Sequence, residues 1–232
     1  MVRLSFLSVL LVCVVSAVSC KSAPDKQAKT VTPNDSIPAL QQDSLLENKG
    51  AFTWLSGREQ HEITLPDSLA KYIARGHEAI DTVTGDINED NINDLVLVTG
   101  LINEDSLRYE SGPINLPRHM LIFMGYKNNQ YHFSFRNKKA IPCITCCGMS
   151  DPYCGMTVHK GWIVLQTYCG SNCKSLSEHR FRYYPKAKDW LLDSVISESY
   201  CFYYEQYELD TLTRKDFGKV SLKTFVLYED EE

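Results

Sequence analysis

The chain has 232 residues, with 24 lysines and arginines against 29 aspartates and glutamates, and its formal net charge is −5 at pH 7. Nucleic-acid-binding domains usually carry a basic balance, so this composition argues against nucleic acid and anionic lipid headgroups as partners. About 180 residues follow the first fifty, which is enough for one domain with a sizeable core.

The first nineteen residues have the pattern of an export signal. Arg3 precedes an apolar run from Leu4 to Val18, which is shorter than the roughly 20 residues that a transmembrane helix needs. The motif that ends it, Ala17-Val18-Ser19-Cys20, resembles the bacterial lipobox. The resemblance implies cleavage before Cys20 and lipid attachment to Cys20. It also implies a membrane-anchored lipoprotein of the bacterial cell envelope, at either the periplasmic or the surface face. The alternative is an ordinary secretory signal.

Residues 20–50 are expected to form a lipidated, flexible tether. They are rich in Ser, Asp, Gln, Lys and Pro, and such a stretch cannot bury enough apolar surface to offset the entropy of ordering it. A single β-rich domain is expected to follow over residues 51–232.

One short helix is expected at the start of this domain, from about Pro66 to Arg75, because apolar residues recur there at helical spacing and the proline stands early. Only strand patterns follow, separated by turn residues. This order predicts an all-β fold, mainly an antiparallel meander, closed as a sandwich, a barrel or a propeller fragment. The predicted strands are Leu95–Leu101, Met120–Met124, Tyr131–Phe135, Gly155–Val158, Trp162–Tyr168, His179–Tyr184, Trp190–Ile196, Tyr200–Tyr207 and Val220–Leu227.

The run Tyr200–Tyr207 is the most aromatic part of the chain. We expect its alternate aromatic side chains to pack in the sheet core, as such residues usually do in strands. The alternative is that they are exposed and bind a glycan or a protein partner.

The most informative stretch is residues 85–95, where oxygen-bearing side chains recur at every second residue. Calcium takes 6 to 8 oxygen ligands in a flexible cage, so this spacing predicts a calcium loop. A structural role is expected, because no pair of titratable groups accompanies the loop. The alternative is a polar turn whose acids face solvent. The predicted ligands are the side chains of Asp86, Asn88, Asp90 and Asp94 and the main-chain carbonyl of Ile92.

This stretch resembles the calcium loop of integrin-type FG-GAP and VCBS repeats, whose pattern is D-x-D/N-x-D-G-x-x-D before a hydrophobic strand. Asn91 stands where the pattern has glycine, and asparagine also tolerates a left-handed backbone. From about Ala79 to Phe225 the chain is also similar to a secreted bacterial family without an agreed activity. Only one copy of the loop is present, so a small β domain is expected rather than a propeller built of several repeats.

Seven cysteines follow the tether, and in an exported protein disulfides are their first explanation. Pairing of Gly155–Val158 with Trp162–Tyr168 around the turn at residues 159–161 would bring most of them to one end of the sheet. Cys201 is expected to be the free thiol. A zinc site and a thiol redox centre stay open as alternatives. The disulfide candidates are Cys143, Cys146, Cys147, Cys154, Cys169 and Cys173.

No catalytic constellation stands out. His61-Glu62 and His77-Glu78 both lack the second histidine that a zinc protease helix needs, and Gly-x-Ser-x-Gly is absent. We therefore expect a noncatalytic, calcium-stabilised binding or structural module on a membrane-anchored lipoprotein. The alternative is an enzyme or a thiol redox protein that uses the cysteine corner, residues 143–173.

Overall fold

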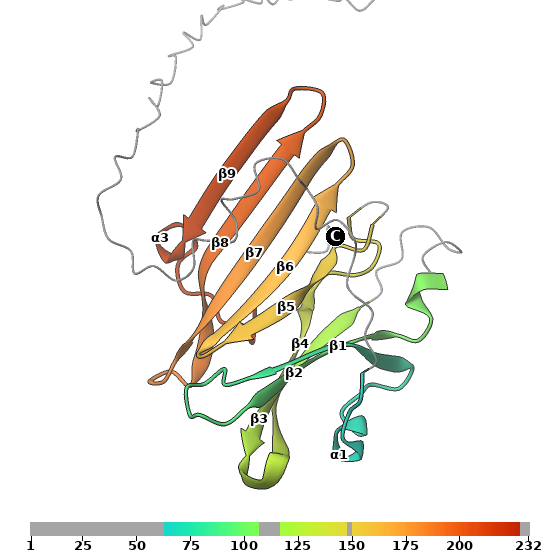
Figure 1. The fold of residues 1–232 in the computed structure, drawn as a ribbon, viewed down its shortest axis with the longest axis vertical. Coiled ribbons are helices and arrows are strands. Elements are labelled where there is room, and N and C mark those ends of the chain that lie inside the picture. The colour runs from blue at the N-terminus through green and yellow to red at the C-terminus, as the bar shows by residue number, and fades with distance from the viewer. Residues whose placement is uncertain (1–62, 107–116, 148–149, 228–232) are drawn as a thin grey trace, which may run out of the picture. The chain divides into compact units, whose positions relative to one another are not determined.

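The computed structural model describes residues 63–106, 117–147 and 150–227, which form two antiparallel β-sheets (Figure 1). The strand orders are β1-β2-β3-β4 in the first sheet and β5-β6-β7-β8-β9 in the second. Within each sheet every strand pairs with the next one along the chain, so the predicted all-β, mainly antiparallel fold is confirmed. The described strands form an open, sandwich-like arrangement rather than a closed barrel. All described residues belong to one compact unit, Ala51–Glu232.

The elements are short helices and long strands. The first sheet contains β1 (His77–Gly85), β2 (Asp94–Leu101), β3 (Arg118–Tyr126) and β4 (Gln130–Ile141). The second contains β5 (Tyr153–His159), β6 (Trp162–Gly170), β7 (Cys173–Tyr184), β8 (Asp189–Cys201) and β9 (Gln206–Thr213). The helices are α1 (Asp67–Ala70), α3 (Arg214–Phe217) and a 3-10 turn at Lys127–Asn129. Within the described ranges, no helix has the length and apolar character to span a membrane.

The central strands of the first sheet, β2 and β3, are buried on both faces, which explains their unbroken apolar runs Leu95–Val98 and Met120–Phe123. Successive side chains of a strand point to opposite faces. Val96 accordingly belongs to the core that the two sheets share. Leu97 packs on the other face with Leu69 of α1.

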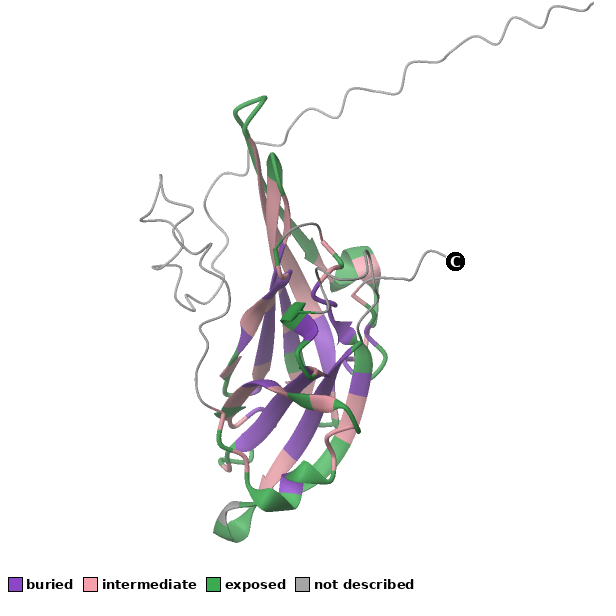
Figure 2. Cartoon of the chain, turned by 90° about the vertical axis from the view of Figure 1, so that its right-hand side faces the viewer, coloured by how far each residue is buried: buried purple, intermediate pink, exposed green. Residues whose placement is uncertain are grey.

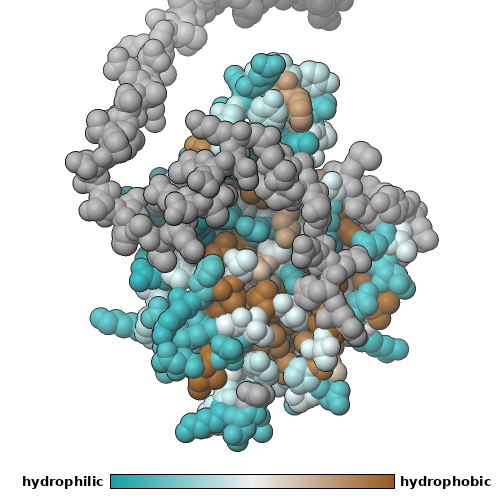
Figure 3. All heavy atoms as spheres, viewed as in Figure 1, coloured by the Kyte–Doolittle hydropathy of each residue, from teal (hydrophilic) through white to brown (hydrophobic). Residues whose placement is uncertain are grey.

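The second sheet buries one face against the first sheet. Ile163 of β6, Phe181 of β7 and Trp190 of β8 all belong to the shared core and are at most 2% exposed. Figure 2 shows buried segments concentrated in the middle of the domain and exposed residues at the ends of the long hairpins. In the space-filling view, hydrophobic residues gather near the middle of the face shown and hydrophilic ones surround them (Figure 3).

The structure corrects the sequence prediction at the start of the domain. The helix expected from Pro66 to Arg75 ends at Ala70, and turns replace the rest, because an isolated helix of this length has little stability of its own. Strand β1 was not among the predicted strands. Few of its residues are buried, so it lacks a clear apolar alternation.

Two predicted strands near the end of the chain are wrong. Tyr200–Tyr207 spans a hairpin turn between β8 and β9, and Glu205 has a φ of 49° where the backbone reverses. Val220–Leu227 is irregular apart from one bridge between Leu191 and Ser221. Its apolar residues Leu222 and Phe225 are nevertheless buried in the shared core. This apolar run therefore packs in the core without pairing as a strand.

Candidate functional site

The predicted calcium loop connects β1 to β2 and is a tight turn organised by its own side chains. The Asp86 carboxylate accepts hydrogen bonds from the amides of Asp90 and Asn91, each at 3.0 Å. The Asn88 side-chain oxygen accepts a second bond from the Asp90 amide at 3.0 Å, and Asp90 Oδ1 accepts from the Ile92 amide at 2.8 Å. The alternating polar residues thus direct their oxygens toward the inside of the turn.

The backbone of the loop is left-handed at two positions. Glu89 has a φ of 67° and Asn91 a φ of 65°. Asparagine adopts this region at a lower cost than most residues, so Asn91 takes the conformation that the glycine of the resembled pattern would take.

Asp94, the last predicted ligand, is fully buried at the start of β2. Its carboxylate accepts from the amides of Gly125, at 2.8 Å, and Ile87, at 3.1 Å. The pKa of Asp94 is raised to about 6, chiefly by burial and to a smaller extent by the charges of Asp90 and Asp86, while the two amide hydrogen bonds act in the opposite direction. The loop therefore concentrates negative charge around a buried carboxylate.

The loop also joins the two sheets. The Trp190 indole of β8 donates to the carbonyl oxygen of Ile87 at 2.7 Å, and Ile87 is fully buried. The turn between β5 and β6 reaches the loop from the same sheet, because the Gly161 amide donates to the Asp86 carbonyl at 2.9 Å. The Lys160 ammonium donates to the Asn91 side-chain oxygen at 2.6 Å and lies 3.8 Å from Asp86 Oδ2.

The donor set of the loop suits a hard cation. The side-chain atoms directed into the turn are carboxylate and amide oxygens, which calcium prefers over nitrogen and sulfur. These oxygens accept single bonds from backbone amides here, and a carboxylate oxygen has room for a further partner. In this conformation they are not gathered around one centre. Within the described residues, no three His, Cys, Asp or Glu side chains form a ready metal cluster.

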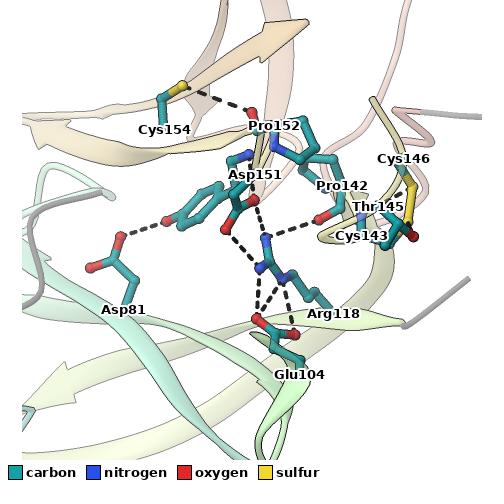
Figure 4. Close-up of polar contacts among 11 residues, drawn as sticks. Asp81, Glu104, Arg118, Pro142, Cys143, Thr145, Cys146, Asp151, Pro152 and Cys154 are labelled. Carbon is teal, nitrogen blue, oxygen red and sulfur yellow. Dashed lines mark hydrogen bonds and ion pairs between the residues drawn. A yellow bond between two sulfur atoms is a disulfide. The ribbon is translucent and has the colours of Figure 1, made fainter. Parts of the chain in front are cut away.

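A second polar centre, which the sequence did not reveal, surrounds Arg118 at the start of β3 (Figure 4). Its guanidinium bonds to Glu104 through Nη2, at 2.6 Å, and to Asp151 through Nη1 and Nη2, at 2.7 and 2.8 Å. Nη1 also donates to the Pro142 carbonyl at 3.3 Å. The Arg118 side chain is 0% exposed, so a buried cation is held by two carboxylates from different connections.

The charge of this centre is fixed. Burial alone would lower the pKa of Arg118, but the hydrogen bonds that the guanidinium donates to Asp151 and Glu104 outweigh burial and raise the pKa, so the guanidinium stays protonated. Beside it, the buried Tyr153 hydroxyl donates to Asp81 at 2.6 Å. Because Asp151 and Tyr153 precede or begin β5 while Arg118 and Asp81 belong to the first sheet, the centre fastens the two sheets together.

Cys143, Cys146 and Cys154 lie close to this centre (Figure 4), and the prediction of disulfides among the cysteines is confirmed. The bonded pairs are Cys143–Cys146, Cys147–Cys169 and Cys173–Cys201. The expected free thiol was wrong: Cys201 pairs with Cys173, and Cys154 is free. The reason is register, because Cys173 and Cys201 face each other across β7 and β8. In this oxidised form, the six bonded sulfurs are unable to serve as thiolate ligands for zinc.

The free thiol is a poor nucleophile in this setting. Burial, with a smaller contribution from the charge of Asp151, raises the pKa of Cys154 to about 11. A thiol reacts as its thiolate, so Cys154 stays protonated and unreactive near neutral pH. Its Sγ lies 3.9 Å from the carbonyl oxygen of Pro152.

The aromatic residues near the β8–β9 turn lie at the surface rather than in the core, which corrects their expected position. Phe202, Tyr203 and Tyr204 are 59%, 76% and 71% exposed. They follow the Cys173–Cys201 disulfide, which ties the end of β8 next to this turn to β7. The alternative of exposed aromatics available to a partner is therefore the one that this geometry supports.

Cys20, the export signal and the expected tether lie outside the described residues. No protein-family model matches the chain, and no curated protein shows detectable similarity to it.

Proposed function

We propose that this protein is an envelope lipoprotein, anchored through Cys20, whose two-sheet domain is a noncatalytic binding module stabilised by calcium in the loop at residues 85–95. The observation that carries the proposal is the position of the loop. The loop holds the carboxylates of Asp86, Asp90 and Asp94 where the two sheets meet. There the Trp190 indole donates a buried hydrogen bond to the Ile87 carbonyl.

Calcium would be held by the side chains of Asp86, Asn88, Asp90 and Asp94 and by the carbonyl of Ile92. Its positive charge would offset the mutual repulsion of the three carboxylates, one of which is fully buried. Lys160 supplies one positive charge at the rim, but its side chain is 60% exposed, so solvent screens it. The loop thus has more negative charge than its own surroundings balance.

A noncatalytic role is supported by the ion pairs and protonation states of the buried polar groups. The carboxylates of Glu104 and Asp151 are engaged by Arg118, and burial keeps the Cys154 thiol protonated. Burial also lowers the pKa of His119 and His179 to about 4, so both imidazoles are neutral at pH 7.

The calcium proposal is tested by thermal unfolding of protein shown to be metal-free. A ligand at 100 times its dissociation constant adds about 2.7 kcal/mol to the free energy of unfolding, so added calcium should raise the melting temperature. D86N/D90N should abolish this rise. D67N/D105N, which removes two exposed acids away from the loop, is the matched control and should keep it. A melt that calcium leaves unchanged contradicts the proposal.

The anchor is tested separately. C20S should move the expressed protein from the membrane fraction to the soluble fraction, because lipid attachment requires the thiol and each acyl chain adds about 0.8 kcal/mol per buried CH₂. C154S, which changes a different unpaired cysteine, should leave the protein in the membrane. Equal membrane retention of C20S and the parent protein would show that another feature holds it there.

A second candidate function is thiol–disulfide exchange at Cys143–Cys146, and the exposure of Cys146 favours it. This candidate predicts disulfide reductase or oxidase activity that C143A/C146A lacks. An oxidised protein without such activity, with the Cys143–Cys146 bond stable in a glutathione buffer, would leave only the binding module.

A further inference from the structure

The two sheets have four edge strands, and three of them are protected. An exposed edge offers unpaired amides and carbonyls to any extended chain, so proteins usually cover edges or place lysine or proline on them. β1 and β5 pack against each other, with the Tyr153 hydroxyl of β5 bonded to Asp81 of β1. β4 carries Lys138 and Lys139, and the Lys139 carbonyl accepts from the Leu227 amide at 3.0 Å.

The fourth edge, β9, lacks these protections. One side of β9 pairs with β8 over its whole length, from Gln206 to Thr213. Within the described residues no strand pairs with its other side, and β9 lies at the margin of the second sheet in Figure 1. Its sequence, QYELDTLT, contains no lysine, arginine or proline, and seven of its eight residues are exposed.

The orientation of its outer amides follows from local hydrogen bonds. The Thr211 amide donates to the side chain of Asp210 at 2.8 Å, and the Thr213 amide donates to Asp216 at 2.8 Å. Neither amide is therefore used in the ladder with β8. Amides that point the same way recur at every second residue, so those of Tyr207 and Leu209 also point to the open side.

The side chains of β9 define the chemistry of a matching strand. One face carries Glu208 and Asp210, and the other carries Tyr207 and Leu209, which are 56% and 62% exposed. Cross-strand neighbours of opposite charge stabilise a sheet. The complementary strand therefore places basic residues on the first face and apolar residues on the second.

A second copy of this chain fits the edge poorly. In an antiparallel pair of β9 strands related by a dyad at Leu209, in the middle of the strand, Glu208 of each copy would lie opposite Asp210 of the other copy on the same face. Like charges opposite each other destabilise a sheet. A partner with the opposite charge avoids this repulsion.

We propose that the open edge of β9 binds an extended segment of another protein in which basic and apolar residues alternate, adding a sixth strand to the second sheet. Main-chain hydrogen bonds provide the affinity in this mode, and alternate side chains provide the selectivity. This partner class rests on the proposed binding role but not on calcium. A negative result in the melting experiment and a negative result in the peptide experiment can therefore be told apart.

The test uses the full-length protein in detergent and a labelled eight-residue peptide of alternating lysine and valine, in about 0.15 M salt to screen nonspecific attraction. E208K/D210K should weaken binding of this peptide at least about tenfold and should gain binding of the glutamate–valine counterpart. D67K/D105K makes the same charge change at exposed positions elsewhere and should bind the lysine peptide within about twofold of the parent.

A backbone variant separates strand pairing from charge attraction. L209P removes an amide on the open side without removing a ladder bond to β8, and L209A is its matched control for the lost side chain. L209P should bind the peptide at least about tenfold more weakly than L209A, with both variants shown to be folded by circular dichroism.

Three results would overturn the proposal. The first is peptide binding that E208K/D210K and L209P leave unchanged. The second is a dimer of the parent protein, seen in sedimentation, that L209P dissociates; this would show that a second copy occupies the β9 edge. The third is hydrogen-exchange protection of the Tyr207 and Leu209 amides without peptide, together with crosslinks from β9 to residues 51–62. This would show that the chain's own segment occupies the β9 edge.

Discussion

Removing the Arg118 guanidinium should destabilise the domain more than any surface substitution. In R118M, Glu104 and Asp151 lose their shared partner. The Glu104 side chain is only 7% exposed and the Asp151 side chain 23%, so Glu104 has little access to water. Removing one partner of a buried ion pair costs about 3–5 kcal/mol, because the other charge remains buried without compensation.

This loss is large compared with the total stability of a domain, about 5–15 kcal/mol. For a domain of this size each kcal/mol corresponds to about 2–4 °C, so the melting temperature should fall by roughly 6–20 °C. The loss of free energy of unfolding is measured by urea unfolding of the oxidised protein. Tryptophan fluorescence follows the transition, since Trp190 is buried in the shared core. R118K, which keeps the charge but loses the planar fork, should fall between R118M and the parent protein.

A compensated variant tests the cause. R118M/E104Q/D151N removes the uncompensated carboxylates and should recover a large part of the loss, because neutral side chains are cheaper to bury than unpaired charges. A loss below about 1 kcal/mol in R118M, or no recovery in the triple variant, would refute the view that this buried charge centre fastens the sheets.

Two other predictions concern pH and the disulfides. The pKa of His119 is lowered to about 4 by burial and by the charges of His77, Arg136 and Lys138. The pKa of His179 is lowered to about 4 by burial, partly opposed by a hydrogen bond that the imidazole donates to the backbone of Leu165. An unfolded histidine titrates near 6.5, so the free energy of unfolding should decrease as the pH falls from about 6.5 to 4. H119F/H179F keeps an aromatic ring at both positions, and its free energy of unfolding, measured by urea titration, should decrease less steeply over this pH range. Asp94 titrates in both proteins, so its effect cancels in the comparison. Equal slopes would contradict the assignment. C173S/C201S opens a crosslink between residues 28 apart and should cost about 2–4 kcal/mol, whereas C143S/C146S opens one between residues 3 apart and should cost less. The reverse order in urea unfolding would contradict this reading.

The sequence by itself determined the features that depend on local pattern. Apolar runs such as Leu95–Val98 and Met120–Phe123 predicted buried strands, because a strand covered on both faces needs a continuous apolar run. The spacing from Asp86 to Asp94 predicted a calcium loop; the structure has a turn there whose Asp and Asn side chains bond to nearby amides, and calcium binding stays a prediction. The cysteine content, in a chain that we expect to be exported, predicted disulfides.

Only the tertiary structure decided which distant residues meet. Register placed Cys201 opposite Cys173 and left Cys154 unpaired. The Arg118 centre gathers side chains from residues 104, 118 and 151, and no local pattern marks such a set. Aromatic residues alone likewise do not distinguish a strand from a turn: the run from Tyr200 became a hairpin because the chain reverses at Glu205. Contacts across a meander depend on how strands pair and where they end, and these choices are made by the packing of the whole core rather than by neighbours along the chain.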